Sequence, residues 1–233
     1  MATLNIFSAG AAQAVVAQIA DSFQRETGNQ VVAAYGAVGA MHARIVAGEP
    51  ADVIILSAAL IDDLIRRGIV AQGSRVDLGK VGTGVAVRAG VPLPDVRTVA
   101  SLRGNILAAT HVLCPDPAVA TAGKIVMSLL DRLGIADQVK PRLQFFPNGN
   151  TAMAHLAQHG GNLDMGITQA TEIIPSEGVT FVGPLPAEVQ TITIYSVGLA
   201  AASVQAELAR SFIERLTGAE GRPLLQKAGY QLD

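Results

Sequence analysis

The chain has 233 residues, of which 50% are hydrophobic and 15% are charged, and its formal net charge is −2. This apolar share supports a sizeable core and argues against disorder. The charge balance is not that of a nucleic-acid-binding protein. Cys114 is the single cysteine, so neither an intrachain disulfide nor a cysteine-based metal site is expected. No apolar run approaches the ~20 residues of a membrane span, so direct membrane insertion is not expected.

The first residues bear on cellular location. Met1-Ala2-Thr3 leads almost directly into the first expected strand, and no signal peptide is visible. The sequence as given therefore predicts a cytoplasmic protein. If it is a mature form that carries a new Met, the prediction becomes a periplasmic protein.

The first two strands are each followed by a turn of small residues and a helix start. The first strand is expected to end at Phe7, and its helix follows a Ser-Ala-Gly turn and runs to about Gln24. The second strand covers 31–35 and leads into the turn 36–40. Small side chains let a ligand approach the backbone closely, and a helix N-terminus favours an anion. The pattern predicts a site for a small anion.

The rest of the chain alternates between strand and helix patterns. The apolar run 51–56 is typical of a strand buried on both faces, and Ser57 is placed to cap the next helix. This alternation predicts an α/β fold with parallel strands. Further strands are expected at 81–87, 106–113, 163–167, 179–182 and 190–199, and further helices at 119–133, 151–159, 204–216 and 218–227.

Two long β-rich runs, 82–88 and 190–199, suit a pair of segments that cross between two lobes. They predict a discontinuous first lobe of residues 1–81 plus 198–233, and a continuous second lobe of residues 82–197.

Several segments, taken in order, resemble a known family. They are the Ser8-Ala9-Gly10 turn, the Tyr35-Gly36-Ala37-Val38-Gly39 turn, Ala47-Gly48-Glu49-Pro50-Ala51-Asp52-Val53, Asp116-Pro117 with Ala122-Gly123, and Leu163-Asp164-Met165-Gly166-Ile167. Together they resemble the type II periplasmic solute-binding proteins, in the molybdate-binding-like branch, over essentially the whole chain. The resemblance implies a two-lobed α/β fold with two hinge crossover strands. It also implies an interlobe cleft in which helix N-termini and backbone amides hold the ligand.

The sequence departs from the molybdate-binding pattern at three places. The resemblance implies serine hydroxyls in the first two turns and a tyrosine in the second lobe. This chain has Ala11 in the first turn, no serine in 36–39 and no tyrosine in 166–170. A desolvated oxyanion needs several donors, so these losses favour an organic carboxylate over molybdate. A subset of the branch lacks these hydroxyls and resembles aconitate isomerase. The Ser-Ala-Gly opening and the glycine-rich second turn of this chain are similar to that subset.

The predicted ligand contacts lie in the expected turns and helix starts. Helix capping is the alternative role of Ser8 and Ser57, and turn formation is the alternative for 38–40 and 148–151. The predicted contacts are Ser8, Gly10, Ala11, Val38, Gly39, Ala40, Ser57, Thr121, Ala122, Asn148, Asn150, Thr168 and Gln169.

Ser8, His42 and Lys124 are the candidates for catalysis. A histidine can act as a base near neutral pH, and a lysine in the first turn of a helix opposes the helix dipole, which an anion would relieve. Arg44 could pair with a ligand carboxylate. An exposed surface position is the alternative for His42, Arg44 and Lys124. His155 and His159 are spaced for zinc but lack a third ligand, so no metal and no cofactor is expected.

Two functions follow from these observations. The first is a solute-binding protein that closes on a small anion and, if exported, works with a membrane ABC transporter. The second is a cofactor-independent isomerase that moves an allylic proton of an unsaturated tricarboxylate such as aconitate.

Overall fold

The computed structural model describes residues 1–232, and within these the chain forms two compact units. Unit 1 contains Met1–Val81 and the segment from Thr193 onward, and unit 2 is Gly82–Ile192. The chain enters unit 2 within β4 (Val76–Arg88) and leaves it within β9 (Ile192–Leu199). This return lies earlier than the predicted boundary at 197/198. The hinge and the cleft implied by the resemblance stay predictions.

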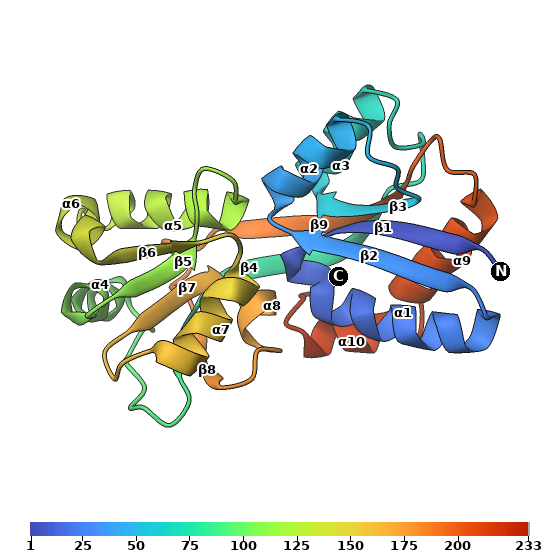
Figure 1. The fold of residues 1–233 in the computed structure, drawn as a ribbon. Coiled ribbons are helices and arrows are strands. Elements are labelled where there is room, and N and C mark those ends of the chain that lie inside the picture. Colours follow the sequence, from blue (N-terminus) through green and yellow to red (C-terminus); the bar gives the residue numbers. More distant parts are fainter. Residues whose placement is uncertain (233) are drawn as a thin grey trace. The chain divides into compact units, whose positions relative to one another are not determined.

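Unit 1 is built on three parallel strands. β1 (Thr3–Ala9) pairs with β2 (Gln30–Gly36) on one side and with β3 (Val53–Ser57) on the other, and β9 runs antiparallel to β3. One face of this sheet carries α2 and α3, and the other carries α1, α9 and α10 (Figure 1). The helical segments of this unit are η1 (Gly10–Ala12), α1 (Gln13–Thr27), α2 (Val38–Val46), α3 (Ala58–Arg66), α9 (Ala206–Thr217) and α10 (Gly221–Lys227).

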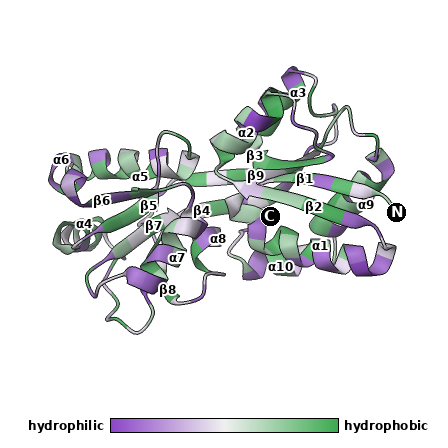
Figure 2. Cartoon of the chain, in the orientation of Figure 1, coloured by the Kyte–Doolittle hydropathy of each residue, from purple (hydrophilic) through white to green (hydrophobic). Residues whose placement is uncertain are grey.

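The core of unit 1 lies on both faces of this sheet. The central β3 is hydrophobic along most of its length (Figure 2), as expected for a strand covered on both faces. Phe23 of α1 meets Phe212 of α9 edge to face, with ring centroids 5.4 Å apart. At the opposite end of the sheet from the helix starts, the buried Asp52 accepts hydrogen bonds from the backbone N–H of Asn5 (2.8 Å) and from Ser203 Oγ (2.6 Å). These bonds tie segments distant in sequence to the first strand.

Unit 2 repeats the arrangement with another parallel set. β5 (Val112–Pro115) lies between β6 (Leu143–Phe146) and β7 (Met165–Gln169), while β4 runs antiparallel to β7 and to β8 (Val179–Pro184). Along β5, Val112 and Cys114 pack with the core of α4, α5 and α6, whereas Leu113 packs with α7. The helical segments are α4 (Val99–Ala108), α5 (Thr121–Arg132), α6 (Ala136–Val139), η2 (Lys140–Arg142), α7 (Gly149–His159) and α8 (Ala170–Ile173).

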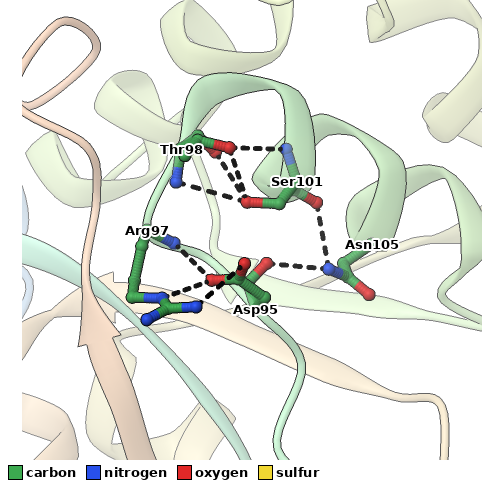
Figure 3. A network of polar contacts seen from close by, with 5 residues as sticks. All are labelled: Asp95, Arg97, Thr98, Ser101 and Asn105. Carbon is green, nitrogen blue, oxygen red and sulfur yellow. Dashed lines mark hydrogen bonds and ion pairs between the residues drawn. The ribbon is translucent and has the colours of Figure 1, made fainter.

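The prediction of a strand over 106–113 was wrong in its first half. α4 continues through Ala108, and β5 begins only at Val112. A capping box starts this helix: Thr98 Oγ1 accepts the backbone N–H of Ser101 (3.1 Å), and Ser101 Oγ accepts that of Thr98 (3.2 Å). Asn105 donates to the backbone oxygens of Asp95 and Ser101, which ties the helix to the preceding loop (Figure 3). These local bonds favour helix over the extended conformation.

The other predicted elements exist with shifted ends. The expected strand at 163–167 begins at Met165 and extends to Gln169, and the expected helix at 151–159 begins two residues earlier, at Gly149. Within residues 1–232, no helix is long and apolar enough to cross a membrane.

Cys114 is expected to be inert in the folded protein. Its side chain is fully buried in β5, and burial, with a smaller contribution from Asp116, raises the pKa of its thiol to about 12. Because the thiolate is the reactive form, an aromatic disulfide reagent at neutral pH should label no thiol in the native protein and one per chain in denaturant. Rapid labelling of the native protein would contradict this packing.

Candidate functional site

In unit 1, the three helix starts lie at one edge of the sheet. Ser8 pairs with Tyr35 on one side and with Ile55 on the other, so β1, β2 and β3 end side by side. Each strand then passes within one or two residues into a helical segment. The structure therefore brings together one group of predicted contacts, and they are Ser8, Gly10, Ala11, Val38, Gly39, Ala40 and Ser57.

The two serines of this edge do not cap helices with their side chains. Ser8 is fully buried within β1, and its hydroxyl donates to the backbone oxygen of Ala9 (3.0 Å). Ala9, not Ser8, precedes the first helical turn, so the capping alternative for Ser8 was wrong. Ser57 occupies the capping position of α3 but makes no side-chain capping bond. Tyr230 donates its hydroxyl to the backbone oxygen of Ala11 (3.1 Å) and so fixes the first turn.

His42 and Arg44 of α2 have partners within unit 1. His42 Nε2 lies 3.1 Å from Asp63 Oδ2 of α3. Arg67 donates to the same oxygen, and its hydrogen bond is the main cause that lowers the pKa of Asp63. Arg44 forms a two-point ion pair with Glu49, at 2.6 and 2.9 Å, and stacks over the ring of Phe7. These contacts give Arg44 a structural role and place His42 beside a carboxylate.

In unit 2, three more helix starts lie at one edge. Pro115 and Phe146 are opposite each other at the ends of β5 and β6, and β7 runs parallel on the other side of β5. The predicted contacts at this edge are Thr121 and Ala122 in the first turn of α5, Asn148 and Asn150 at the start of α7, and Thr168 and Gln169 at the end of β7. Lys124 is in the first turn of α5 and is exposed.

The start of α7 is capped by a side chain. Asn148 Oδ1 accepts the backbone N–H of Thr151 (2.9 Å) and its hydroxyl (2.7 Å). This confirms the predicted capping turn at 148–151 and commits the oxygen of Asn148 to the helix.

Gln169 is the most unusual polar side chain of this edge. It is the last residue of β7 and is 1% exposed, yet neither Oε1 nor Nε2 has a hydrogen-bond partner among the described residues. A buried polar group without a partner costs about 1–3 kcal/mol, so proteins rarely keep one without a reason.

Sequence reasoning missed Glu172, which lies in α8 and is 5% exposed. Its carboxylate accepts the hydroxyl of Thr168 at 2.6 Å and the backbone N–H groups of Gly149 and Gln169. Burial raises its pKa, and these hydrogen bonds act in the opposite direction. The one available signal was a carboxylate four residues after Thr168 in a segment without basic residues.

Residues 1–232 contain no group of three or more histidine, cysteine, aspartate or glutamate side chains arranged to hold a metal ion. The rings of His155 and His159 are in contact, with centroids 4.8 Å apart and planes tilted by 50°, and His155 also packs against Phe146.

Residues 4–231 match the family described as bacterial extracellular solute-binding protein. The chain belongs to this family. Among curated relatives of this solute-binding protein, an aconitate isomerase from Pseudomonas sp. is 27% identical over 236 residues, covering 98% of this chain and 87% of the relative. YvgL of Bacillus subtilis, assigned as an ABC transporter substrate-binding lipoprotein, is 24% identical over 98% of this chain and 86% of the relative.

A solved structure of the periplasmic molybdate-binding protein of Azotobacter vinelandii has the same fold. It superposes with a TM-score of 0.83 at 22% identity, and the match covers 99% of both chains. The α/β fold of this solute-binding protein is thus that of the periplasmic molybdate-binding protein.

Proposed function

We propose that this solute-binding protein binds a small organic polycarboxylate with the strand-end turns of its two units. The observation that carries the proposal is the buried amide of Gln169. An amide N–H donates well to a carboxylate, and a ligand carboxylate would supply the partner that Nε2 lacks. The backbone N–H groups at the helix starts provide further donors.

The side chains of unit 1 support a carboxylate over molybdate. Ala11 and 36–40 offer no hydroxyl, and the hydroxyl of Ser8 is already donated to Ala9. In the first two turns a tetrahedral oxyanion would depend on backbone donors, and the other predicted contact of unit 1 with a hydroxyl is Ser57, which makes no side-chain capping bond. A polycarboxylate spreads its charge over several groups and can use more of these backbone donors at once.

The comparisons add support from the relatives' names. One curated relative is named for an enzyme of aconitate, a tricarboxylate, and another for an ABC transporter. We extend both to this chain as proposals: its ligand is of the aconitate type, it is exported, and it delivers the ligand to an ABC transporter.

A thermal-shift panel tests the proposed function. A ligand present at 100 times its Kd stabilises the folded state by about 2.7 kcal/mol, which raises the Tm of a chain of this size by roughly 5–10 °C. We expect this shift with trans-aconitate and a smaller one with molybdate at equal concentration. Shifts with molybdate or sulfate and none with any polycarboxylate would contradict the proposal.

The second candidate function is isomerisation. It is favoured by the similarity to the aconitate isomerase from Pseudomonas sp., which covers 98% of this chain and 87% of that relative. In this reaction a C–H bond breaks at one allylic carbon, the electron pair spreads into the conjugated carboxylate, and a C–H bond forms at the other allylic carbon. Ser8, His42 and Lys124 are the candidates for moving the proton.

Proton NMR of cis- and trans-aconitate in D₂O separates the two functions. Interconversion or deuterium uptake with catalytic amounts of protein would establish the isomerase. Unchanged spectra combined with a thermal shift would establish binding alone.

A further inference from the structure

The carboxylate of Glu172 occupies the start of α7 from within the protein. Gly149 is the first residue of this helix, and its backbone N–H, which has no partner within the helix, donates to Glu172. A Cβ atom at position 149 would lie 2.5 Å from Glu172 Cδ and would also overlap Thr168 Oγ1, so the close approach requires glycine. A negative charge is favoured at this end of a helix. The position that an anionic ligand could take at α7 is therefore held by an internal carboxylate.

The same carboxylate determines whether the hydroxyl of Thr168 can donate a hydrogen bond to another group. A hydroxyl has one proton to donate, and Thr168 gives it to Glu172 over 2.6 Å. While Glu172 is ionised, Thr168 Oγ1 has only lone pairs for any other group. When Glu172 is protonated, its own O–H can donate to Oγ1, which frees the threonine proton. The end of β7 thus changes from acceptor to donor with one protonation.

The negative charge at this position is not neutralised by an ion pair. Within residues 1–232 no lysine, arginine or histidine pairs with Glu172. Among the elements packed on α8, the titratable side chains are His155 and His159 of α7, since β7 and β8 carry none. The ring of His155 packs against Phe146 of β6, and the ring of His159 packs against that of His155.

We propose that Glu172 determines ligand specificity: its carboxylate opposes a fully ionised ligand beside Gln169, and protonating or neutralising it strengthens binding. This inference rests on the proposed function, because it assumes that Gln169 contacts the ligand. It assigns the other ligand carboxylates to the helix starts of α5 and unit 1, and it makes the carboxylate beside Gln169 the one whose binding an ionised Glu172 weakens.

The test compares the parent protein with Glu172→Gln by calorimetric titration of two probes, trans-aconitate and sulfate, between about pH 5.5 and about pH 8.5. Glutamine mimics the protonated acid. For each probe, the Kd of the parent is divided by the Kd of the variant at the same pH. This ratio cancels the titration of the probe itself. We expect Glu172→Gln to bind about tenfold more tightly than the parent at the high pH and this advantage to shrink as the pH falls, because burial raises the pKa of Glu172 above its ordinary value. Glu177→Gln, which removes an exposed carboxylate just after α8, should leave the parental profile unchanged.

Other outcomes separate the two proposals. Parallel pH profiles for parent and variant, or weaker binding by Glu172→Gln at every pH, would overturn the role of Glu172 and leave the proposed function standing. Binding of sulfate without trans-aconitate would contradict the proposed function, and the ratio measured on sulfate would still decide the role of Glu172. Failure to bind either probe overturns both.

Stability against pH provides a ligand-free check of the same group. Burial raises the pKa of Glu172 in the folded state, so folded protein holds this proton more tightly than the unfolded chain does. The contribution of Glu172 to stability is therefore greatest below its ordinary pKa and declines as the pH rises to the raised one. Glu172→Gln should lack this decline, and an identical decline in the variant would overturn the inference.

Discussion

Gln169→Leu is expected to make the ligand-free protein more stable while it weakens ligand binding. Leucine keeps most of the volume of the side chain and removes two buried polar atoms that have no partner. Relief of this desolvation should raise the free energy of unfolding by about 1–2 kcal/mol. Loss of the amide hydrogen bond to a charged ligand should raise the Kd about 10- to 100-fold. Chemical denaturation and calorimetry measure the two effects separately.

Thr171→Val is the matched control for this prediction. Thr171 is also 1% exposed, its Oγ1 also lacks a partner, and valine has nearly the same shape. The control should gain stability and keep the parental affinity, because Thr171 is not a predicted contact. A stable Gln169→Leu protein with unchanged affinity would remove Gln169 from the binding site, and the proposed function would lose its main support.

Gly123→Ala is expected to destabilise unit 2 and to weaken binding together. Gly123 lies in the first turn of α5, packed against the loop that follows β5. A Cβ atom there would lie 2.6 Å from the nitrogen of Pro117 and 2.7 Å from the carbonyl carbon of Asp116, so backbone must move. We expect a loss of about 3 kcal/mol, which is roughly 6–12 °C in Tm, and at least a tenfold rise in Kd.

Gly104→Ala is the matched control, and we expect it to raise stability where Gly123→Ala lowers it. Gly104 is exposed in α4, and an added Cβ would meet nothing within 4 Å. Alanine is the better helix former, so this variant should gain about 0.5–1 kcal/mol and bind as the parent does. Equal melting temperatures for the two variants would show that the close packing at Gly123 is not needed.

The strand ends could be predicted from the sequence because small residues mark them. Ser8-Ala9-Gly10 and Gly36-Ala37 each span the end of an apolar strand and the approach to a helix, and periodicity locates both junctions to within about two residues. That these junctions and Ser57 lie side by side required the parallel register of β1, β2 and β3.

The features that sequence reasoning missed depend on packing. Glu172 is typical of an exposed helical residue until α7 packs on α8 and brings the backbone of Gly149 to it. The start of β5 was misplaced because the short apolar run that begins at Ile106 is compatible with either a helix or a strand. The capping-box hydrogen bonds between Thr98 and Ser101 favour the helix. The engaged hydroxyl of Ser8 is equally invisible in the sequence.

The most direct test of the central claim is a calorimetric titration of the protein with trans-aconitate and with molybdate under identical conditions. The proposed function predicts that trans-aconitate binds at least about 100-fold more tightly, a difference of about 2.7 kcal/mol. Tighter binding of molybdate would contradict it, and would mean that a tetrahedral oxyanion is held without a hydroxyl from the turns at Ala11 and 36–40.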